Sequence, residues 1–191
     1  ISKQQLIIIN EVENISEMMS KKIIEFSKNG GNLVIIPNEK TNINSYNSLL
    51  KFLNVGKIQP KKIDTLKITK INFSHPLFQN VFSKKVTNFQ YPTVQSYFPI
   101  SSKNASDIVS FENNTSFISQ IKNTKSTIYW VSSSLNRKNS NFINSPLIVP
   151  VFYNFGKLSF KHTQLFYRID AKNKIDINTT IDNDKVLRIA N

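Results

Sequence analysis

The 191-residue sequence contains no cysteine, only four glycines and only two histidines. Without cysteine, the chain has no disulfide bond, no thiolate ligand for zinc and no cysteine nucleophile. Loops that bind phosphate through glycines lie between a strand and a helix, whereas the pair Gly30-Gly31 lies between a predicted helix and a predicted strand. His75 precedes a proline and is interpreted as a turn residue with a local hydrogen bond, and His162 has no carboxylate near it in sequence. We therefore predict no metal site and no cofactor.

Acidic residues are also scarce, with 12 against 25 basic ones and a formal net charge of +13. The excess is lysine scattered along the chain, and the only arginines are Arg137, Arg168 and Arg188. Because recognition of base edges and phosphates usually relies on arginine, we interpret the lysines as solvated surface charge. We expect no specific nucleic-acid partner, and binding of a polyanion through the lysine-rich middle is the least favoured functional hypothesis.

No apolar run approaches the roughly 20 residues that span a bilayer. Shorter runs at residues 6–9 and 33–36 are continuously apolar, which is typical of strands buried on both faces. Between them, apolar residues at helical spacing over residues 15–26 predict a helix that begins near Asn14 or Ser16. This order predicts a βαβ unit with parallel strands.

The rest of the chain alternates between α/β and β-rich patterns. A second helix is predicted at residues 45–53, followed by a β-rich insertion at about 57–126 with a hairpin around Asn113-Asn114. Residues 128–131 predict a buried strand and residues 145–155 a helix, in which Pro150 requires a distorted first turn or a later start. We predict an α/β domain over residues 1–159, and a β-strand extension or the start of a following β module over 160–191.

Polar residues follow each of the first two predicted strands. Asn10, Glu11 and Glu13 come after the first strand, and Asn38 and Glu39 come after the second. Open α/β sheets bind ligands at the carboxyl ends of their parallel strands, so these five residues are the candidate ligand-binding set. The competing interpretation is that Glu11 and Glu13 lie in a solvated loop that favours the start of the next helix.

The order of residues 6–10, a helix and then residues 29–37 resembles the class I glutamine amidotransferase-like fold, a flavodoxin-like three-layer sandwich. In catalytic members of that family a cysteine occupies the sharp turn after the strand that corresponds to residues 33–36. This chain has Pro37-Asn38-Glu39 at that turn. The resemblance therefore implies a fold without the family's thiolate chemistry, and we predict that the chain is not an enzyme.

A narrower resemblance covers most of the chain. Its residues 30–37, 45–50, 74–78 and 145–153 are similar to segments of the large membrane-anchored proteins of bacterial aerotolerance (Bat) operons. The resemblance implies a domain on the extracytoplasmic (periplasmic) side of the inner membrane, with other proteins of a membrane-associated complex as partners. Because the chain opens at Ile1 without a methionine, we interpret it as a fragment of a longer protein. We predict no transmembrane segment within the fragment, and the resemblance implies that the longer protein is membrane-anchored.

Two functional hypotheses follow from these observations. The first is a non-catalytic interaction or scaffold domain of a larger bacterial protein. The alternative is a module that binds a small molecule or an anion at the carboxyl edge of the parallel sheet. A pocket lined by convergent polar groups at that edge favours the alternative, whereas a filled edge favours the first hypothesis.

Overall fold

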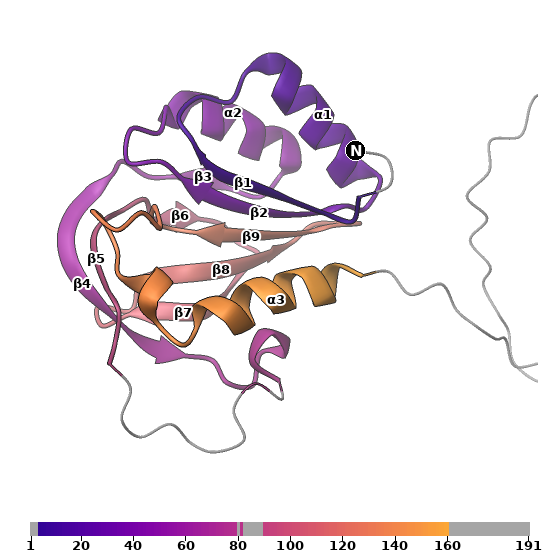
Figure 1. Cartoon of the computed structure of the whole chain (residues 1–191). Helices are drawn as coiled ribbons and strands as arrows, with labels where there is room; N and C mark the ends of the chain where they lie inside the picture. The colour runs from indigo at the N-terminus through magenta and orange to yellow at the C-terminus, as the bar shows by residue number, and fades with distance from the viewer. Residues whose placement is uncertain (1–3, 80, 82–89, 161–191) are drawn as a thin grey trace, which may run out of the picture. The chain divides into compact units, whose positions relative to one another are not determined.

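The N-terminal part of the chain folds as the predicted βαβ unit (Figure 1). The computed structural model describes residues 4–79, 81 and 90–160, all within the first of two units, Ile1–Phe160. Strand β1 (Leu6–Val12) pairs in parallel with β2 (Asn32–Pro37), and helix α1 (Glu17–Lys28) connects them. The predicted parallel pairing is confirmed, and the β module predicted for residues 160–191 lies, apart from Phe160, outside the described residues.

Local side chains explain where α1 begins and ends. Ser16 caps its start, because the Ser16 hydroxyl accepts a hydrogen bond from the Met19 backbone N–H. Beyond its end, Gly30 has a φ of 85°, a left-handed conformation that glycine adopts without strain. A Cβ atom at Gly31 would lie 2.2 Å from the Phe26 ring, so this position also requires glycine.

Helix α2 spans Ile43–Leu53 and begins two residues before the predicted start. The cap is Asn42, whose side-chain oxygen accepts hydrogen bonds from the backbone N–H groups of Asn44 and Ser45. At the other end, Asn54 takes the left-handed conformation with a φ of 55°, so the helix ends before Gly56. Asparagine tolerates this conformation better than other residues with a Cβ atom.

A mixed seven-stranded sheet forms the centre of the domain, in the order β1-β2-β9-β8-β7-β4-β5. Strand β9 pairs in parallel with β2, and every later neighbour in this order is antiparallel. The predicted β-rich insertion thus supplies four strands of the same sheet. The further strands are β4 (Lys62–Ile71), β5 (Thr93–Tyr97), β7 (Ala105–Phe111), β8 (Ser116–Lys122) and β9 (Thr127–Val131), with β3 (Lys57–Ile58) and β6 (Ile100–Ser101) forming a two-stranded sheet.

The hairpin predicted around Asn113-Asn114 is confirmed, since β7 and β8 pair across it and Asn114 has a φ of 67°. Two short 3-10 helices, η1 (Pro76–Phe78) and η2 (Phe142–Asn144), lie in the connections.

Helix α3 spans Ile148–Ser159. The later start is confirmed, because Pro150 is the third helical residue, where a backbone N–H has no acceptor within the helix. The predicted end at Phe155 is wrong. The helix continues through Gly156 because Phe155 and Ser159, on either side of it, are both buried.

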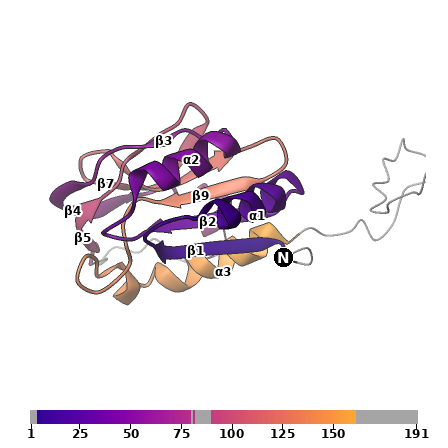
Figure 2. The same cartoon turned by 90° about the horizontal axis from the view of Figure 1, so that it is seen from above.

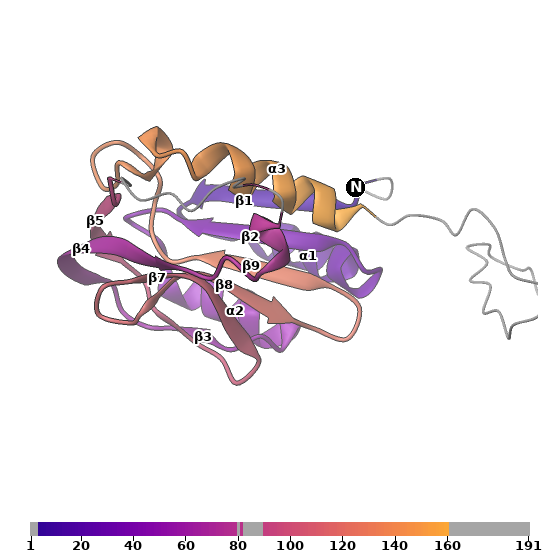
Figure 3. The ribbon, with the colours of Figure 1, turned by 90° about the horizontal axis from the view of Figure 1, so that it is seen from below.

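Helices cover both faces of the sheet (Figures 1, 2 and 3). Leu33 and Ile35 of β2 belong to the core beneath α1 and α2, whereas Val34 and Ile36 belong to the core beneath α3. All four side chains are fully buried, as the apolar run predicted. The same prediction for residues 6–9 is wrong, because β1 is an edge strand and Ile8 is 42% exposed. The first core also holds Trp130, whose indole N–H donates to the Phe98 carbonyl oxygen at 3.1 Å.

Candidate functional site

The five predicted ligand residues lie where β1 and β2 end. Glu11 lies within β1 with a φ of 51°, and the pairing of β1 with β2 shifts register between Asn10 and Val12. Such a left-handed conformation costs a residue with a side chain roughly 1 kcal/mol. Other contacts of Glu11 must therefore offset this conformational cost, and those of its carboxylate are the clearest.

The Glu11 carboxylate accepts hydrogen bonds from the loop that follows β9. Its Oε1 accepts from the backbone N–H groups of Leu135, at 2.8 Å, and Asn136, at 3.0 Å. Its Oε2 accepts from Asn136 Nδ2 at 3.4 Å. Two backbone amides and one side-chain amide thus surround a single carboxylate, an arrangement that favours an anion.

Asn136 joins this carboxylate to a second one. Its Nδ2 also donates to Glu39 Oε1 at 2.8 Å. Its Oδ1 accepts from the backbone N–H groups of Lys138 and Asn139, both at 3.1 Å, which fixes the side chain in a local turn. Asn136 was not among the predicted site residues, because nothing in a polar loop of several asparagines distinguishes it.

The other predicted residues take part unequally. Asn38 Nδ2 donates to the Glu11 carbonyl oxygen at 3.2 Å, so Glu11, Asn38 and Glu39 are brought together. Asn10 and Glu13 are exposed, and Glu13 accepts a hydrogen bond from the Asn42 backbone N–H through its own carbonyl oxygen. At the carboxyl edge, the side chains of Glu11, Asn38 and Glu39 therefore bind groups of the chain itself.

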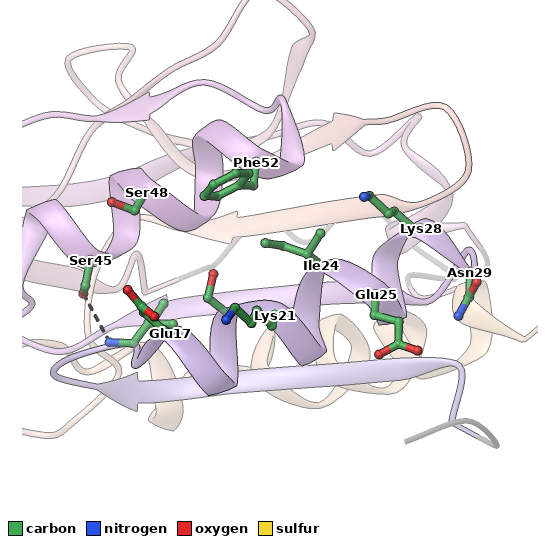
Figure 4. A pocket seen from close by; sticks show the side chains of 11 residues that line it. Glu17, Lys21, Ile24, Glu25, Lys28, Asn29, Ser45, Ser48 and Phe52 are labelled. Carbon is green, nitrogen blue, oxygen red and sulfur yellow. Dashed lines mark hydrogen bonds between the residues drawn. The ribbon is translucent and has the colours of Figure 1, made fainter.

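A groove of about 910 Å³ runs between α1 and α2 (Figure 4). None of the five predicted residues lines it. Its walls carry both signs of charge, Lys21 and Glu25 among them, and Phe52 of α2 is 70% exposed at its side. Because these charges offset each other, the groove has no evident preference for an anion or a cation.

Three serines follow β9, and of these only Ser133 has a hydrogen-bonded hydroxyl, since the Ser132 and Ser134 hydroxyls are buried without a partner among the described residues. Ser132, Ser133 and Ser134 are buried, and the Ser133 hydroxyl donates to the Ser134 carbonyl oxygen at 2.8 Å. Asn139 Nδ2 in turn donates to Ser133 Oγ at 2.8 Å and to the Ser96 carbonyl oxygen at 2.9 Å. A serine nucleophile needs a base that accepts its proton, and here the Ser133 proton is held by a carbonyl.

His75 has the local role that the sequence predicted. Its Nδ1 accepts from the Leu77 backbone N–H at 3.2 Å, so its Nε2 carries the proton and donates to Gln120 Oε1 at 3.1 Å. Gln120 Nε2 then donates to the Tyr129 hydroxyl, and burial raises the pKa of Tyr129. Within residues 4–79, 81 and 90–160, no three His, Asp or Glu side chains gather as ligands for a metal ion.

No family model and no curated protein sequence matches the chain. Solved structures do match it. The cytoplasmic protein STM3548 of Salmonella typhimurium is 15% identical with a TM-score of 0.60, over 81% of this chain and 71% of that one. The cytoplasmic protein STM1381 of the same species is 13% identical with a TM-score of 0.62, over 82% and 72%. A ThuA-like protein of Bacteroides uniformis is 13% identical with a TM-score of 0.50, over 78% and 67%.

These likenesses show a mixed α/β fold that is consistent with the predicted amidotransferase-like fold. They contradict the predicted extracytoplasmic location, since both Salmonella proteins are described as cytoplasmic. The prediction was wrong for a physical reason. The segments that suggested it form a buried strand, parts of the helices α2 and α3 and a 3-10 helix, and such elements carry no information about the compartment. In the described part of the chain, no helix has the length and apolar character to cross a membrane.

Proposed function

We propose that the chain is a non-catalytic interaction domain of a larger bacterial protein. The observation that carries the proposal is the hydrogen-bond network of Glu11 at the carboxyl edge of β1, β2 and β9. In open α/β sheets this edge holds the ligand. Here a carboxylate of the chain itself takes the amides of Leu135 and Asn136, so these two donors are not free to bind a small molecule.

The chemistry of the edge supports the same conclusion. Strand β2 ends at Pro37, which offers no nucleophilic side chain. The buried Ser133 donates its proton to a backbone carbonyl, and His75 is engaged with Leu77 and Gln120. As part of this proposal, we regard the chain as an amidotransferase-like three-layer domain that keeps the scaffold without the thiolate chemistry.

A screen for hydrolytic activity tests this proposal. The full chain and its Ser133→Ala and Glu11→Gln variants are incubated with chromogenic esters, amides, phosphoesters and glycosides. We expect no turnover above buffer for any of the three proteins. Turnover by the parent chain that either substitution abolishes would overturn the proposal.

One observation favours the alternative function, a module that binds anions. The amides of Leu135 and Asn136 already bind a carboxylate, so the edge has the donors that an external carboxylate or phosphate needs. Such a ligand would have to displace Glu11, which is held close by β1. The alternative therefore requires a measurable exchange between Glu11 and a free anion.

A further inference from the structure

The lateral edge of β1 that faces away from β2 carries open backbone groups. β1 is the first strand in the sheet order, so it is paired on one side only. The Gln5 carbonyl oxygen accepts from the Asn32 backbone N–H, and successive residues of a strand direct these groups to opposite sides. The N–H and C=O groups of Leu6, Ile8 and Asn10 therefore point away from β2, and no hydrogen bond joins them to another described residue.

The opposite edge of the same sheet is covered by the chain itself. Strand β5 ends the sheet on that side, and an antiparallel bridge connects it to the loop after β9. The Gln95 backbone N–H donates to the Asn139 carbonyl oxygen at 2.8 Å, and the Thr93 backbone N–H donates to Asn141 Oδ1 at 2.7 Å. In the described part of the chain, one edge strand is thus satisfied by a loop, whereas β1 is left open.

The side chains of β1 have the pattern of an internal strand. Residues 6–9 are continuously apolar, which is typical of parallel strands inside a sheet whose faces are both covered. Ile8 is nevertheless 42% exposed. Edge strands are commonly protected by lysine or proline, and residues 6–10 contain neither. This disagreement between pattern and position favours a further strand beside β1.

The chemistry of the open edge specifies the occupant. Alternating N–H and C=O groups pair with the backbone of another extended chain. Ile8 shares the α3 side of the sheet with Val34, its partner in register, so an added strand needs an apolar side chain beside Ile8. Figure 2 shows β1 between α1 and α3, and a second copy of the chain would bring its own α1 and α3 to the same two faces. A single peptide strand avoids this crowding.

We propose that the open edge of β1, from Leu6 to Asn10, is a strand-addition site for an extended apolar segment of another protein. This inference rests on the proposed interaction function and names the surface and the chemistry of its partner. The site ends at Asn10, because Glu11 has a left-handed φ and the pairing shifts register there. A strand of about five residues buries a small area, so we expect a dissociation constant on the order of 100 µM.

The test uses the parent chain and two synthetic peptides of seven residues, the length of β1. Both peptides have the same sequence of valine and threonine and the same fluorescent label. The first carries N-methyl groups on alternate residues, which block one edge and leave the other free to pair. The second carries N-methyl groups on every residue, so neither edge donates a hydrogen bond. We expect fluorescence anisotropy to show at least about tenfold tighter binding of the first peptide.

Hydrogen exchange followed by nuclear magnetic resonance locates the bound peptide. In the parent chain alone, the amides of Ile7 and Ile9, which point to β2, should exchange more slowly than those of Leu6, Ile8 and Asn10. A saturating concentration of the first peptide should slow exchange of these last three amides at least about tenfold, because each gains an acceptor.

Two matched substitutions test the surface from the side of the protein. Ile8→Lys places a charge on the open edge and should weaken binding of the first peptide at least about tenfold. Ile63→Lys is the control, because Ile63 is 82% exposed and lies on β4, away from β1 in the sheet order. Circular dichroism checks the folding of both variants. The two peptides and the exchange pattern are measured on the parent chain, so they decide the inference even if Ile8→Lys unfolds the domain.

No binding, equal binding of the two peptides, or protection of other strands in place of β1 would overturn the inference. Equal effects of Ile8→Lys and Ile63→Lys in folded variants would overturn it as well. A dimer in sedimentation velocity that Ile8→Lys abolishes would overturn it in favour of a second copy. The hydrolytic screen tests the proposed function separately, so the two can fail independently.

Discussion

At the scale of single residues, Glu11 shows what a local pattern can and cannot reveal. Its position after the apolar run of residues 6–9 was enough to mark it as a candidate ligand residue. Its partners, the amides of Leu135 and Asn136, lie 124 and 125 residues further along the chain. No local pattern reports a contact at that separation, so the sequence suggested a binding role and the structure shows an internal one.

Glu11→Ala should destabilise the domain by roughly 2 kcal/mol, because it leaves two backbone amides without their charged acceptor. Urea unfolding measures the change. Glu25→Ala on α1 is the control, since Glu25 is exposed, and we expect its effect to stay within about 0.5 kcal/mol. Equal stability of the two variants would show that the Glu11 contacts contribute nothing.

The raised pKa of Tyr46 predicts how the stability of the domain changes at alkaline pH. Burial raises the pKa of Tyr46 from 10.0 to about 12, and its hydroxyl donates to the Val12 carbonyl oxygen. Between pH 10 and 12 the unfolded chain loses the phenol proton while the folded domain retains it, so stability falls as pH rises through this window. Tyr129 acts in the same direction, since burial raises its pKa too.

Urea unfolding between pH 8 and pH 11 should therefore show a decline above about pH 10 that is shallower in Tyr46→Phe. At neutral pH this variant should lose about 1 kcal/mol with the hydrogen bond to Val12. An identical decline in both proteins would contradict the assignment to Tyr46.

At the scale of single elements, two helix-associated glycines should respond to alanine with opposite signs. Gly156→Ala should stabilise the domain by about 1 kcal/mol, because the new methyl group meets nothing and the helix gains propensity. Gly31→Ala should destabilise it by roughly 1 to 3 kcal/mol, because the methyl group collides with Phe26. Thermal unfolding measures both, and a destabilising Gly156→Ala would show that α3 needs the glycine for its own packing.

The elements that the sequence predicted well are those with strong local signals. Residues 33–36 indicated a strand buried on both faces, and Asn113-Asn114 indicated a hairpin. The boundaries of α2 and α3 were less accurate. We predicted that α2 begins at Ser45, whereas its cap is Asn42. We predicted that α3 ends before Gly156, whereas the helix continues to Ser159 because the residues on both sides of the glycine are buried.

At the scale of the whole domain, the order of the strands in the sheet could not be predicted from the sequence. Strand β9 pairs with β2 although the paired residues lie more than 90 positions apart in the chain. The strands predicted as an insertion then extend the same sheet, because β8 pairs with β9 on its other side. Pairing between distant strands depends on packing of the two cores, which a local apolar pattern does not encode. The family resemblance suggested the fold but could not give the compartment.

Hydrogen exchange should reproduce this sheet order. The amides of β2 and β9, which lie between neighbours on both sides, should exchange most slowly and only on global unfolding. Those of β5, at the edge, should exchange sooner. Mass spectrometry of peptic fragments measures the difference, and equal protection of β9 and β5 would contradict the topology.

The most direct test of the central claim, that the chain fills its own ligand edge, is an acetate titration followed by nuclear magnetic resonance. The backbone amide signals of Leu135 and Asn136 are recorded in the parent chain and in Glu11→Ala. We expect both signals to stay in place in the parent and to shift saturably in the variant, where acetate replaces the missing carboxylate. Saturable shifts in the parent would contradict the claim, because they would show that an external anion displaces Glu11.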